Sequence, residues 1–417
     1  MRRNLASLVV ANCLFGLAFG VYELAFPLFL DDRGVRLESI GLVLAAGAIV
    51  NFLIVVYGGR LSDLRGRKGV YAAGFLVAGL TNAATPFAPH VAVLAVLKTL
   101  QQAGVSIRQS LRGVLVYEAV AAERFSRVFG QMTGLEVICQ TAGFACVGMV
   151  GLGPTAVLSY RGLFAISAAA LAVGMAVFLA CFRETRPANV PDLGRLSLRD
   201  LLARDLHPKL YLIIASGFIF CIGLTANHAL YPLYFRQRLD GPWAADLEAF
   251  EGWLRAAWPW AARVWAGGDD GGRFALVSLL AAVHRLGLGI PMFVMAPLIR
   301  RRFKGFYVGC LALGGVLTLA VGLVDWTTGS FLAVAIVWPL HDLAGASIWF
   351  PIQERFIQEY SRPERRATQV AKVRALMALG LVIGTALAGP LMAVDPALPF
   401  TAGGGLIVLA SLILLAL

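Results

Sequence analysis

The sequence has 417 residues, of which 59% are hydrophobic and only 14% are charged, and its mean hydropathy is +0.76. A typical soluble domain has about 25% charged residues, so this composition excludes the soluble globular class. The formal net charge of +12 would point to a nucleic-acid partner in a soluble protein, but in a membrane protein the positions of the basic residues decide its meaning.

Apolar runs long enough to cross a bilayer recur along the whole sequence. A transmembrane helix needs about 20 apolar residues to cross ~30 Å of hydrocarbon, and we count twelve such runs. The sequence therefore predicts an all-α membrane protein with twelve transmembrane helices. The predicted spans are residues 5–30, 39–59, 69–88, 92–118, 129–151, 158–182, 209–235, 274–299, 305–324, 331–353, 370–393 and 400–417.

Lys and Arg residues are concentrated in alternate connections between these spans. Because basic loops remain in the cytoplasm, the asymmetry predicts that both termini are cytoplasmic and that the chain is a multi-pass protein of the cell (cytoplasmic or inner) membrane. The basic excess then reflects topology, and we expect no nucleic-acid partner. The groups assigned to the cytoplasm are Arg2 and Arg3, the loop at 58–69, Arg124 and Arg127, and residues 183–209, 300–304 and 355–374.

The sequence has no motif that is typical of a metal site or an enzyme. The six cysteines all fall inside predicted spans, and none belongs to a CxxC pair or a His/Cys cluster at metal-ligand spacing. HExxH, GxSxG and phosphate-loop patterns do not occur. We therefore predict no metal, no cofactor and no enzymatic activity.

The loop after the second predicted span, GGRLSDLRGRKG (58–69), places five charged residues between two runs that contain almost none. Its pattern resembles the signature of the major facilitator superfamily, a family of secondary transporters. One position differs, because Leu64 follows the aspartate where the family usually has a basic residue, and Arg65 comes one position later. The matching residues are Gly59, Leu61, Ser62, Asp63, Gly66, Arg67 and Lys68.

The resemblance implies two six-helix bundles that alternate access to a central site, with this loop acting as a latch in one of the two states. A carboxylate at the membrane edge is stabilised by an arginine or by the positive end of a helix, so we expect Asp63 to meet Arg112 and the start of the eleventh span. A loop that only anchors topology is the alternative. The predicted gating residues are Gly59, Asp63, Arg65, Gly66, Arg67, Lys68 and Arg112.

The fourth predicted span carries a polar stripe. On a helical wheel its polar residues fall within an arc of about 160°, and each cation at a helix centre costs about 2.5–3.5 kcal/mol to insert. We therefore expect the stripe to face water, a partner carboxylate or a substrate, and we assign four of its members to substrate binding. Arg112 also lies on the stripe, and the four are Lys98, Gln102, Arg108 and Gln109.

Few acidic residues lie inside the predicted spans. A carboxylate that is shielded from water favours its neutral form, so Glu23, Asp342 and Glu136 are predicted proton-coupling residues. A permanent ion pair with Lys98, Arg108 or Arg285 is the alternative for each. His341 precedes Asp342, but neighbours on a regular helix point about 100° apart, so we do not interpret them as a dyad. Further predicted substrate-binding residues are His228, Arg285 and His341.

Two segments interrupt the apolar pattern. Residues 183–208 contain prolines and mixed charge, which predicts a cytoplasmic linker between bundles at 1–182 and 209–417, with substrate bound between them near the midplane. Residues 236–273 form a Trp-rich outer insertion with five of the eight tryptophans. Because Trp243, Leu247 and Trp258 share one helical face, we expect this insertion to lie at the lipid headgroups. A lid over the substrate path is the alternative.

Together these observations predict a monomeric secondary active transporter that works by alternating access. Its partners are the lipid bilayer, protons and a small-molecule substrate, which the basic residues of the fourth span indicate to be an organic anion or zwitterion. Efflux of amphipathic drugs or lipid-like compounds is an alternative. A membrane receptor or sensor that does not transport is an alternative of another class.

Overall fold

The computed structural model describes residues 2–151, 160–184, 206–257, 269–295, 304–361 and 366–417. The predicted linker therefore lies almost wholly outside the described residues, as does part of the Trp-rich insertion. Gly59 and Asp63 lie in a described helix, but the surroundings of Gly59 and of the Asp63 side chain are not described. Every element of the described part of the chain is helical.

Six long helices form the N-terminal group. They are α1 (Arg2–Asp32), α2 (Leu37–Arg65), α3 (Arg67–Ala84), α4 (Val91–Ala119), α5 (Ala122–Gly151) and α6 (Tyr160–Cys181). Helices α1 and α2 are continuous over 31 and 29 residues, and the predicted spans 5–30 and 39–59 lie within them. Pro86 ends α3 in a short 3₁₀ turn, Thr85–Phe87, because proline cannot continue the helical hydrogen bonding.

The remaining helices form the C-terminal group. They are α8 (Pro208–His228), α9 (Tyr231–Leu239), α10 (Ala244–Ala257), α12 (Asp269–Met295), α13 (Lys304–Thr328), α14 (Phe331–His341), α15 (Ser347–Tyr360), α16 (Arg366–Val394) and α17 (Leu398–Ile413). One π-helical turn, η3 (Asp342–Ala346), joins α14 to α15. A 3₁₀ turn, η5 (Leu414–Ala416), follows α17.

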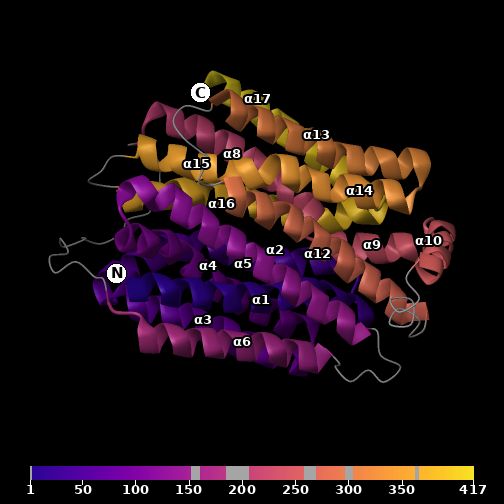
Figure 1. Cartoon of the computed structure of the whole chain (residues 1–417), viewed down its shortest axis with the longest axis horizontal. Helices are drawn as coiled ribbons and strands as arrows, with labels where there is room; N and C mark the ends of the chain where they lie inside the picture. Colours follow the sequence, from indigo (N-terminus) through magenta and orange to yellow (C-terminus); the bar gives the residue numbers. More distant parts are fainter. Residues whose placement is uncertain (1, 152–159, 185–205, 258–268, 296–303, 362–365) are drawn as a thin grey trace.

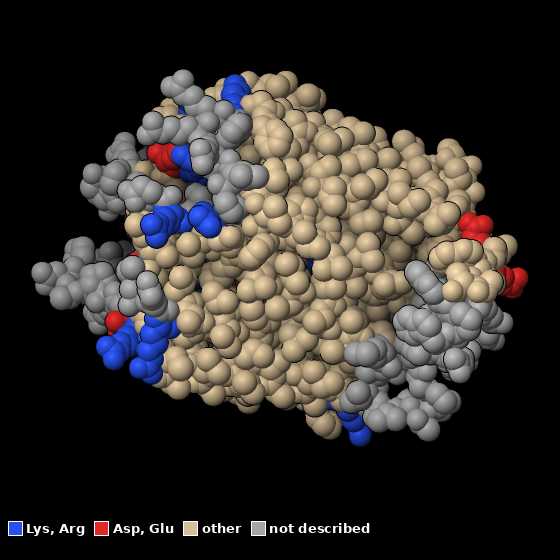
Figure 2. Space-filling view, in the orientation of Figure 1, with Lys and Arg blue, Asp and Glu red and all other residues tan. Residues whose placement is uncertain are grey.

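Nine helical stretches of the described residues are long and apolar enough to cross a membrane. Three predicted spans are not among these nine: α2 contributes only a shorter apolar stretch, Leu37–Val50, and α4 and α5 carry buried charged residues. Figure 2 shows a broad face with almost no charged atoms, with most of the basic residues at the end where the N-terminus lies. Large apolar side chains are exposed on the helix surfaces, including Leu42, Leu80 and Ile336. Such a belt is stable only against lipid, so the chain is a membrane-spanning protein.

The helices pack within each group through small residues. A Cβ atom on Gly104 of α4 would lie 2.6 Å from the carbonyl oxygen of Gly74 on α3, which leaves no room for any side chain. The same holds between α8 and α17, where a Cβ on Gly403 would lie 2.6 Å from the Gly223 carbonyl oxygen. In a membrane, where lipid is as apolar as the protein, close backbone approach supplies the dispersion contacts that hold helices together.

The two groups meet along two helix pairs, α5 with α12 and α2 with α16 (Figure 1). Glycines again permit the approach, because a Cβ on Gly134 of α5 would lie 2.8 Å from the Gly289 carbonyl oxygen on α12. A Cβ on Gly41 of α2 would lie 3.2 Å from the backbone nitrogen of Gly389 on α16. Polar groups that lie between these pairs are thus shared by both groups.

Trp243 corrects the expectation that the tryptophans of the outer insertion lie at the lipid headgroups. Its side chain is fully buried, and its indole Nε1 donates a hydrogen bond to Asp325 Oδ1 of α13 at 3.1 Å. Leu247 on the same face of α10 is also buried. The apolar face of α10 packs on protein because the C-terminal group offers aromatic side chains there, such as Phe331 at 5.7 Å from Trp243 between ring centroids. Trp253 is exposed, and Trp258 lies outside the described residues.

Candidate functional site

An ion pair joins the two groups in the interior. The guanidinium of Arg285 on α12 donates to Glu23 Oε1 on α1 at 2.5 Å. Both side chains are largely buried, with 13% of Arg285 and 22% of Glu23 exposed. The second carboxylate oxygen, Glu23 Oε2, is buried and has no hydrogen-bond partner among the described residues. The carboxylate therefore has spare capacity to accept a proton or a further donor.

Lys98 of α4 projects toward the same helix that carries Glu23. Its Nζ donates to Gln101 Oε1 at 3.0 Å and lies 5.0 Å from the Tyr22 ring centroid and 5.7 Å from that of Phe26. Among the described residues it has no carboxylate within ion-pair distance. Aromatic faces stabilise a cation only partly. Lys98 is thus a mostly buried cation that can accept an anionic group.

A second buried cluster lies inside the N-terminal group, where α1, α4 and α5 meet. Arg108 donates to Glu136 Oε1 at 2.6 Å, and Arg112 donates to Glu136 Oε2 at 2.5 Å. Arg108 also donates to Asn12 Oδ1 and lies 3.4 Å above the Phe15 ring centroid. Arg108 is fully buried. The Arg108 charge is therefore paired within one group of helices, which corresponds to the ion-pair alternative for Glu136.

The other predicted substrate-binding residues of the α4 stripe do not join this cluster. Gln102 is half-buried and lies near α2, where a Cβ on Gly47 would lie 3.3 Å from Gln102 Cβ. Gln109 is exposed. A helix stripe spanning about 160° faces several neighbours at once, so only part of it meets any one of them.

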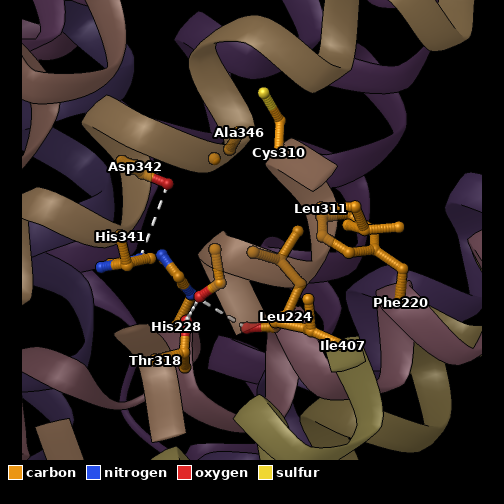
Figure 3. Close-up of a pocket in the computed structure, with 12 residues that line it drawn as sticks. Phe220, Leu224, His228, Cys310, Leu311, Thr318, His341, Asp342, Ala346 and Ile407 are labelled. Carbon is orange, nitrogen blue, oxygen red and sulfur yellow. Dashed lines mark hydrogen bonds and ion pairs between the residues drawn. The ribbon is translucent and has the colours of Figure 1, made fainter. Parts of the chain in front are cut away.

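A third cluster lies within the C-terminal group and brings together His228 of α8, His284 of α12, His341 of α14 and Asp342 of η3. One ligand-type atom from each of the four lies within 4.8 Å of those of the others. His284 Nε2 is 2.8 Å from Asp342 Oδ2, and His228 Nε2 is 3.4 Å from His284 Nε2. Figure 3 shows His228, His341 and Asp342 at a pocket whose other side is apolar and includes Phe220, Leu311 and Ile407.

The π-helical turn explains why adjacent residues reach one cluster. On a regular α-helix His341 and Asp342 would point about 100° apart, but η3 begins at Asp342 and widens the helix there. His341 Nε2 consequently lies 3.5 Å from Asp342 Oδ1. The spacing of these residues gave no sign of this cluster, and His284 was not predicted as a site residue. Its position next to Arg285, in a span with few polar residues, was the only available signal.

Two carboxylates that were not predicted as site residues, Glu118 and Glu184, hold the loop between α2 and α3. Gly66 has φ of +97°, a conformation that favours glycine, and it lets α3 start directly after α2. Arg67 forms an ion pair with Glu118 of α4. Glu184, just after α6, accepts hydrogen bonds from the backbone nitrogens of Arg67 and Lys68, each at 3.1 Å. A carboxylate at a helix N-terminus satisfies donors that have no partner within the helix.

The structure describes the side chains of only some of the predicted gating residues. Lys68 is half-buried and Arg65 is exposed. The described partner of Arg112 is Glu136, and because the surroundings of Gly59 and of the Asp63 side chain are not described, the latch stays a prediction.

At the opposite end of the molecule a second set of ion pairs connects the groups. Arg236 of α9 contacts Asp31 Oδ2 at 3.2 Å and Asp32 Oδ1 at 2.5 Å, both at the end of α1. Tyr160 at the start of α6 donates to Asp32 Oδ2 at 2.5 Å. The three charged side chains are each about one third exposed. None of these four residues was predicted as a site residue, because loop charges carry no distinctive spacing.

A protein-family model and several known proteins match this chain. Residues 8–268 match the family model described as Major Facilitator Superfamily. Over 230 residues the chain is 22% identical to the quinolone resistance protein NorA of Staphylococcus aureus strain MSSA476, and 25% identical to that of strain MRSA252. These alignments cover 54% of this chain and 57% of the relatives, so the chain spans little more than half the length of the curated relatives it matches.

Solved structures share the fold over the full length. The human organic anion transporter MFSD10 (TETRAN) superposes with a TM-score of 0.71 at 17% identity, covering 99% of both chains. The nucleoside transporter NupG superposes with a TM-score of 0.66 at 14% identity, over 100% of this chain and 99% of that one. The family model covers more than half of the chain and confirms the resemblance of the loop at 58–69. The chain belongs to the Major Facilitator Superfamily.

Proposed function

We propose that this protein is a proton-coupled secondary transporter of a small organic anion or zwitterion, working by alternating access as a monomer. In this proposal twelve helices form two bundles, residues 1–182 and 209–417, joined by a cytoplasmic linker at 183–208. Both termini are cytoplasmic, and the membrane is the cell (inner) membrane. Family membership supports transport, while the finer points rest on the charges described above.

Lys98 carries the substrate assignment. It is the mostly buried cation of α4 whose described partners are an amide oxygen and two aromatic rings. Such a cation is poorly compensated, so an anionic group of a substrate would gain both charge attraction and a desolvated hydrogen bond. Gln102, one turn further along α4, adds an amide that can donate or accept. Arg108 is already compensated by Glu136, so it contributes less to binding in this proposal.

Glu23 is the proposed proton carrier. Its partner Arg285 comes from the other group of helices, so the pair must separate when the groups move apart around a central site. A carboxylate that loses its cation while shielded from water favours the neutral form. Glu136 keeps two arginine partners within its own group and would not be released by that movement. The Glu23–Arg285 pair therefore supplies the physical link between proton binding and rocking of the two groups.

A second candidate function is efflux of amphipathic compounds. It is favoured by the sequence similarity to the quinolone resistance protein NorA over 230 residues. In that case the aromatic side chains near Lys98, Tyr22 and Phe26, would contact the apolar part of a substrate, and the lysine would be less important. The two functions therefore differ in how strongly they depend on Lys98.

Counterflow in proteoliposomes separates these functions. Vesicles loaded with a panel of organic anions, zwitterions and cationic amphipathic dyes are tested for exchange with labelled solute. We expect exchange of an anion or zwitterion that falls at least about tenfold in Lys98→Ala, because a charge-assisted hydrogen bond contributes about 1.5–3 kcal/mol. Lys304→Ala is the matched control, since that lysine is exposed and donates to the Leu415 carbonyl oxygen near the end of the chain. Dye exchange that is unchanged in Lys98→Ala would favour the efflux function.

A further inference from the structure

Four side chains from three segments of the C-terminal group converge on one point. His228 comes from the end of α8, His284 from the middle of α12, and His341 with Asp342 from the junction of α14 and η3. Their ligand-type atoms lie within 4.8 Å of one another. His284, His341 and Asp342 are each at most 4% exposed. Segments far apart in the sequence therefore contribute donors to a small interior volume.

The tautomers of His228 and His341 are set so that one lone pair of each ring points inward. His228 Nδ1 contacts the Leu224 carbonyl oxygen at 3.1 Å, and His341 Nδ1 contacts the Trp338 carbonyl oxygen. A carbonyl oxygen only accepts, so each Nδ1 carries the proton and each Nε2 is left with a free lone pair. Histidines that ligate metals are held in this way, with the outer ring nitrogen donating to a backbone carbonyl or a carboxylate.

The inward atoms are only partly satisfied by one another. His284 Nε2 lies 2.8 Å from Asp342 Oδ2 and 3.4 Å from His228 Nε2, and a single N–H on His284 can satisfy only one of these two acceptors. His341 Nε2 is buried and has no hydrogen-bond partner among the described residues. Buried polar atoms of this kind call for an explanation such as an ion. A cation would satisfy all three imidazoles and the Asp342 carboxylate together.

The size and the donor set fit a tetrahedral divalent metal. With Zn–N bonds of about 2.0–2.1 Å, ligand atoms of a tetrahedral site lie about 3.3 Å apart, close to the separation of the two Nε2 atoms. Imidazole nitrogens with one carboxylate suit Zn²⁺ and its first-row neighbours better than Mg²⁺ or Ca²⁺.

We propose that His228, His284, His341 and Asp342 bind one first-row divalent metal ion, Zn²⁺ by preference. Four protein ligands fill a tetrahedral shell and leave no open position, which is typical of a structural site. The stacked ring of Trp338, 4.4 Å from His284 between centroids, shields one side. The metal would clamp α8, α12 and α14 to one another. This assigns His228, His341 and Asp342 to metal binding in place of the substrate and proton roles predicted for them, and it does not depend on the identity of the substrate.

The test measures metal retention and needs no transport assay. Chain purified in detergent without a polyhistidine tag is stripped with a chelator, incubated with Zn²⁺, desalted and analysed for zinc per chain by mass spectrometry. We expect about one Zn²⁺ per chain, and Co²⁺ in its place giving the intense visible absorption of a tetrahedral site. His284→Gln and Asp342→Asn each remove one ligand, so we expect affinity to fall by at least about 10- to 100-fold. His90→Gln is the matched control, because His90 is exposed and outside the cluster.

A thermal-unfolding series gives an independent readout. Zn²⁺ should raise the midpoint of unfolding in wild type and in His90→Gln, and it should leave the midpoint of His284→Gln unchanged. Asp342→Asn keeps the side-chain volume and serves if His284→Gln fails to give a monodisperse protein. Wild-type chain that retains no zinc above the detergent blank would overturn the proposal, leaving a shared proton as the species between the imidazoles. Equal zinc retention in the two cluster variants and in wild type would overturn it as well.

Discussion

Glu23 of α1 and Arg285 of α12 form a 2.5 Å ion pair that spans the contact between the two groups of helices. The pair lies one residue along α12 from His284, which belongs to a cluster contained within the C-terminal group. An ion pair that joins the two groups of helices thus lies next to a cluster whose members all belong to one group. The proposed movement of one group against the other would break this ion pair and preserve the cluster.

Glu23→Gln should uncouple transport from the proton gradient. The amide occupies the same space and can still bond Arg285, but it cannot bind and release a proton. In proteoliposomes we expect substrate accumulation driven by a pH gradient to be lost, while counterflow exchange without a gradient stays within about threefold of wild type. Glu38→Gln is the control, because Glu38 pairs with the exposed Arg36 at the start of α2. Gradient-driven accumulation in Glu23→Gln would exclude Glu23 as the carrier.

Glu136→Gln should destabilise the protein strongly. Glu136 compensates both Arg108 and Arg112, so the amide leaves two buried cations short of charge. Removing one partner of a buried ion pair costs about 3–5 kcal/mol. We expect a clearly lower unfolding midpoint in detergent, measured by fluorescence-detected size-exclusion after heating. Glu359→Gln breaks an exposed pair with Arg355 and should change stability by about 1 kcal/mol at most. Equal midpoints for the two variants would contradict the assignment.

Arg236→Gln should shift the balance between the two access states. Arg236 ties α9 to the end of α1 through Asp31 and Asp32, and these side chains are about one third exposed. Pairs of this kind contribute about 0.2–1 kcal/mol each, which corresponds to a shift of about 1.4- to 5-fold per pair in the population that is closed at this end.

Pulsed electron resonance between spin labels at Val91 and Thr328, in a cysteine-free background, would report that shift as a larger fraction of long distances. Arg36→Gln is the control, since Arg36 is 82% exposed and pairs with Glu38 nearby on the chain. An unchanged distance distribution in Arg236→Gln would mean that these ion pairs do not hold this end closed.

Trp243→Ala and Trp253→Ala should differ in their effect on stability. Trp243 is fully buried and donates to Asp325 Oδ1, so its truncation leaves a cavity and removes the described donor to that oxygen, at a cost of about 3–5 kcal/mol. Trp253 is 53% exposed, so its loss should stay within about 0.5 kcal/mol. Unfolding midpoints of both variants in detergent provide the measurement. A large loss for Trp253→Ala and none for Trp243→Ala would place the anchor of α10 elsewhere.

Several features could be predicted from the sequence because they depend on local composition. Apolar runs of about 20 residues set the membrane class, and the spacing of Asp63, Gly66 and Arg67 indicated the family that the family model confirms. The polar stripe of α4 was also recognisable as internal, because a lone cation is costly in lipid. Arg108 and Arg112 of the stripe are indeed buried, whereas Gln109 is exposed.

The partners of these charged residues could not be predicted from the sequence. Helical periodicity gives the face on which Arg108 lies, but whether Glu136, Asp63 or a substrate meets that face depends on how α4 packs against α5. The burial of Trp243 depends in the same way on aromatic neighbours more than 80 residues away, such as Phe331.

The length and hydropathy of the apolar runs determined that this chain spans a membrane, and one loop motif indicated its family. Both features could be recognised because each depends only on the residues of a single segment. Only the tertiary structure decided that His228, His284 and His341 converge with Asp342. That convergence needs α8, α12 and α14 to meet, and it needs the π-helical turn at Asp342 to rotate two adjacent side chains into one volume. Contacts between distant segments leave no periodic trace in the residues that make them.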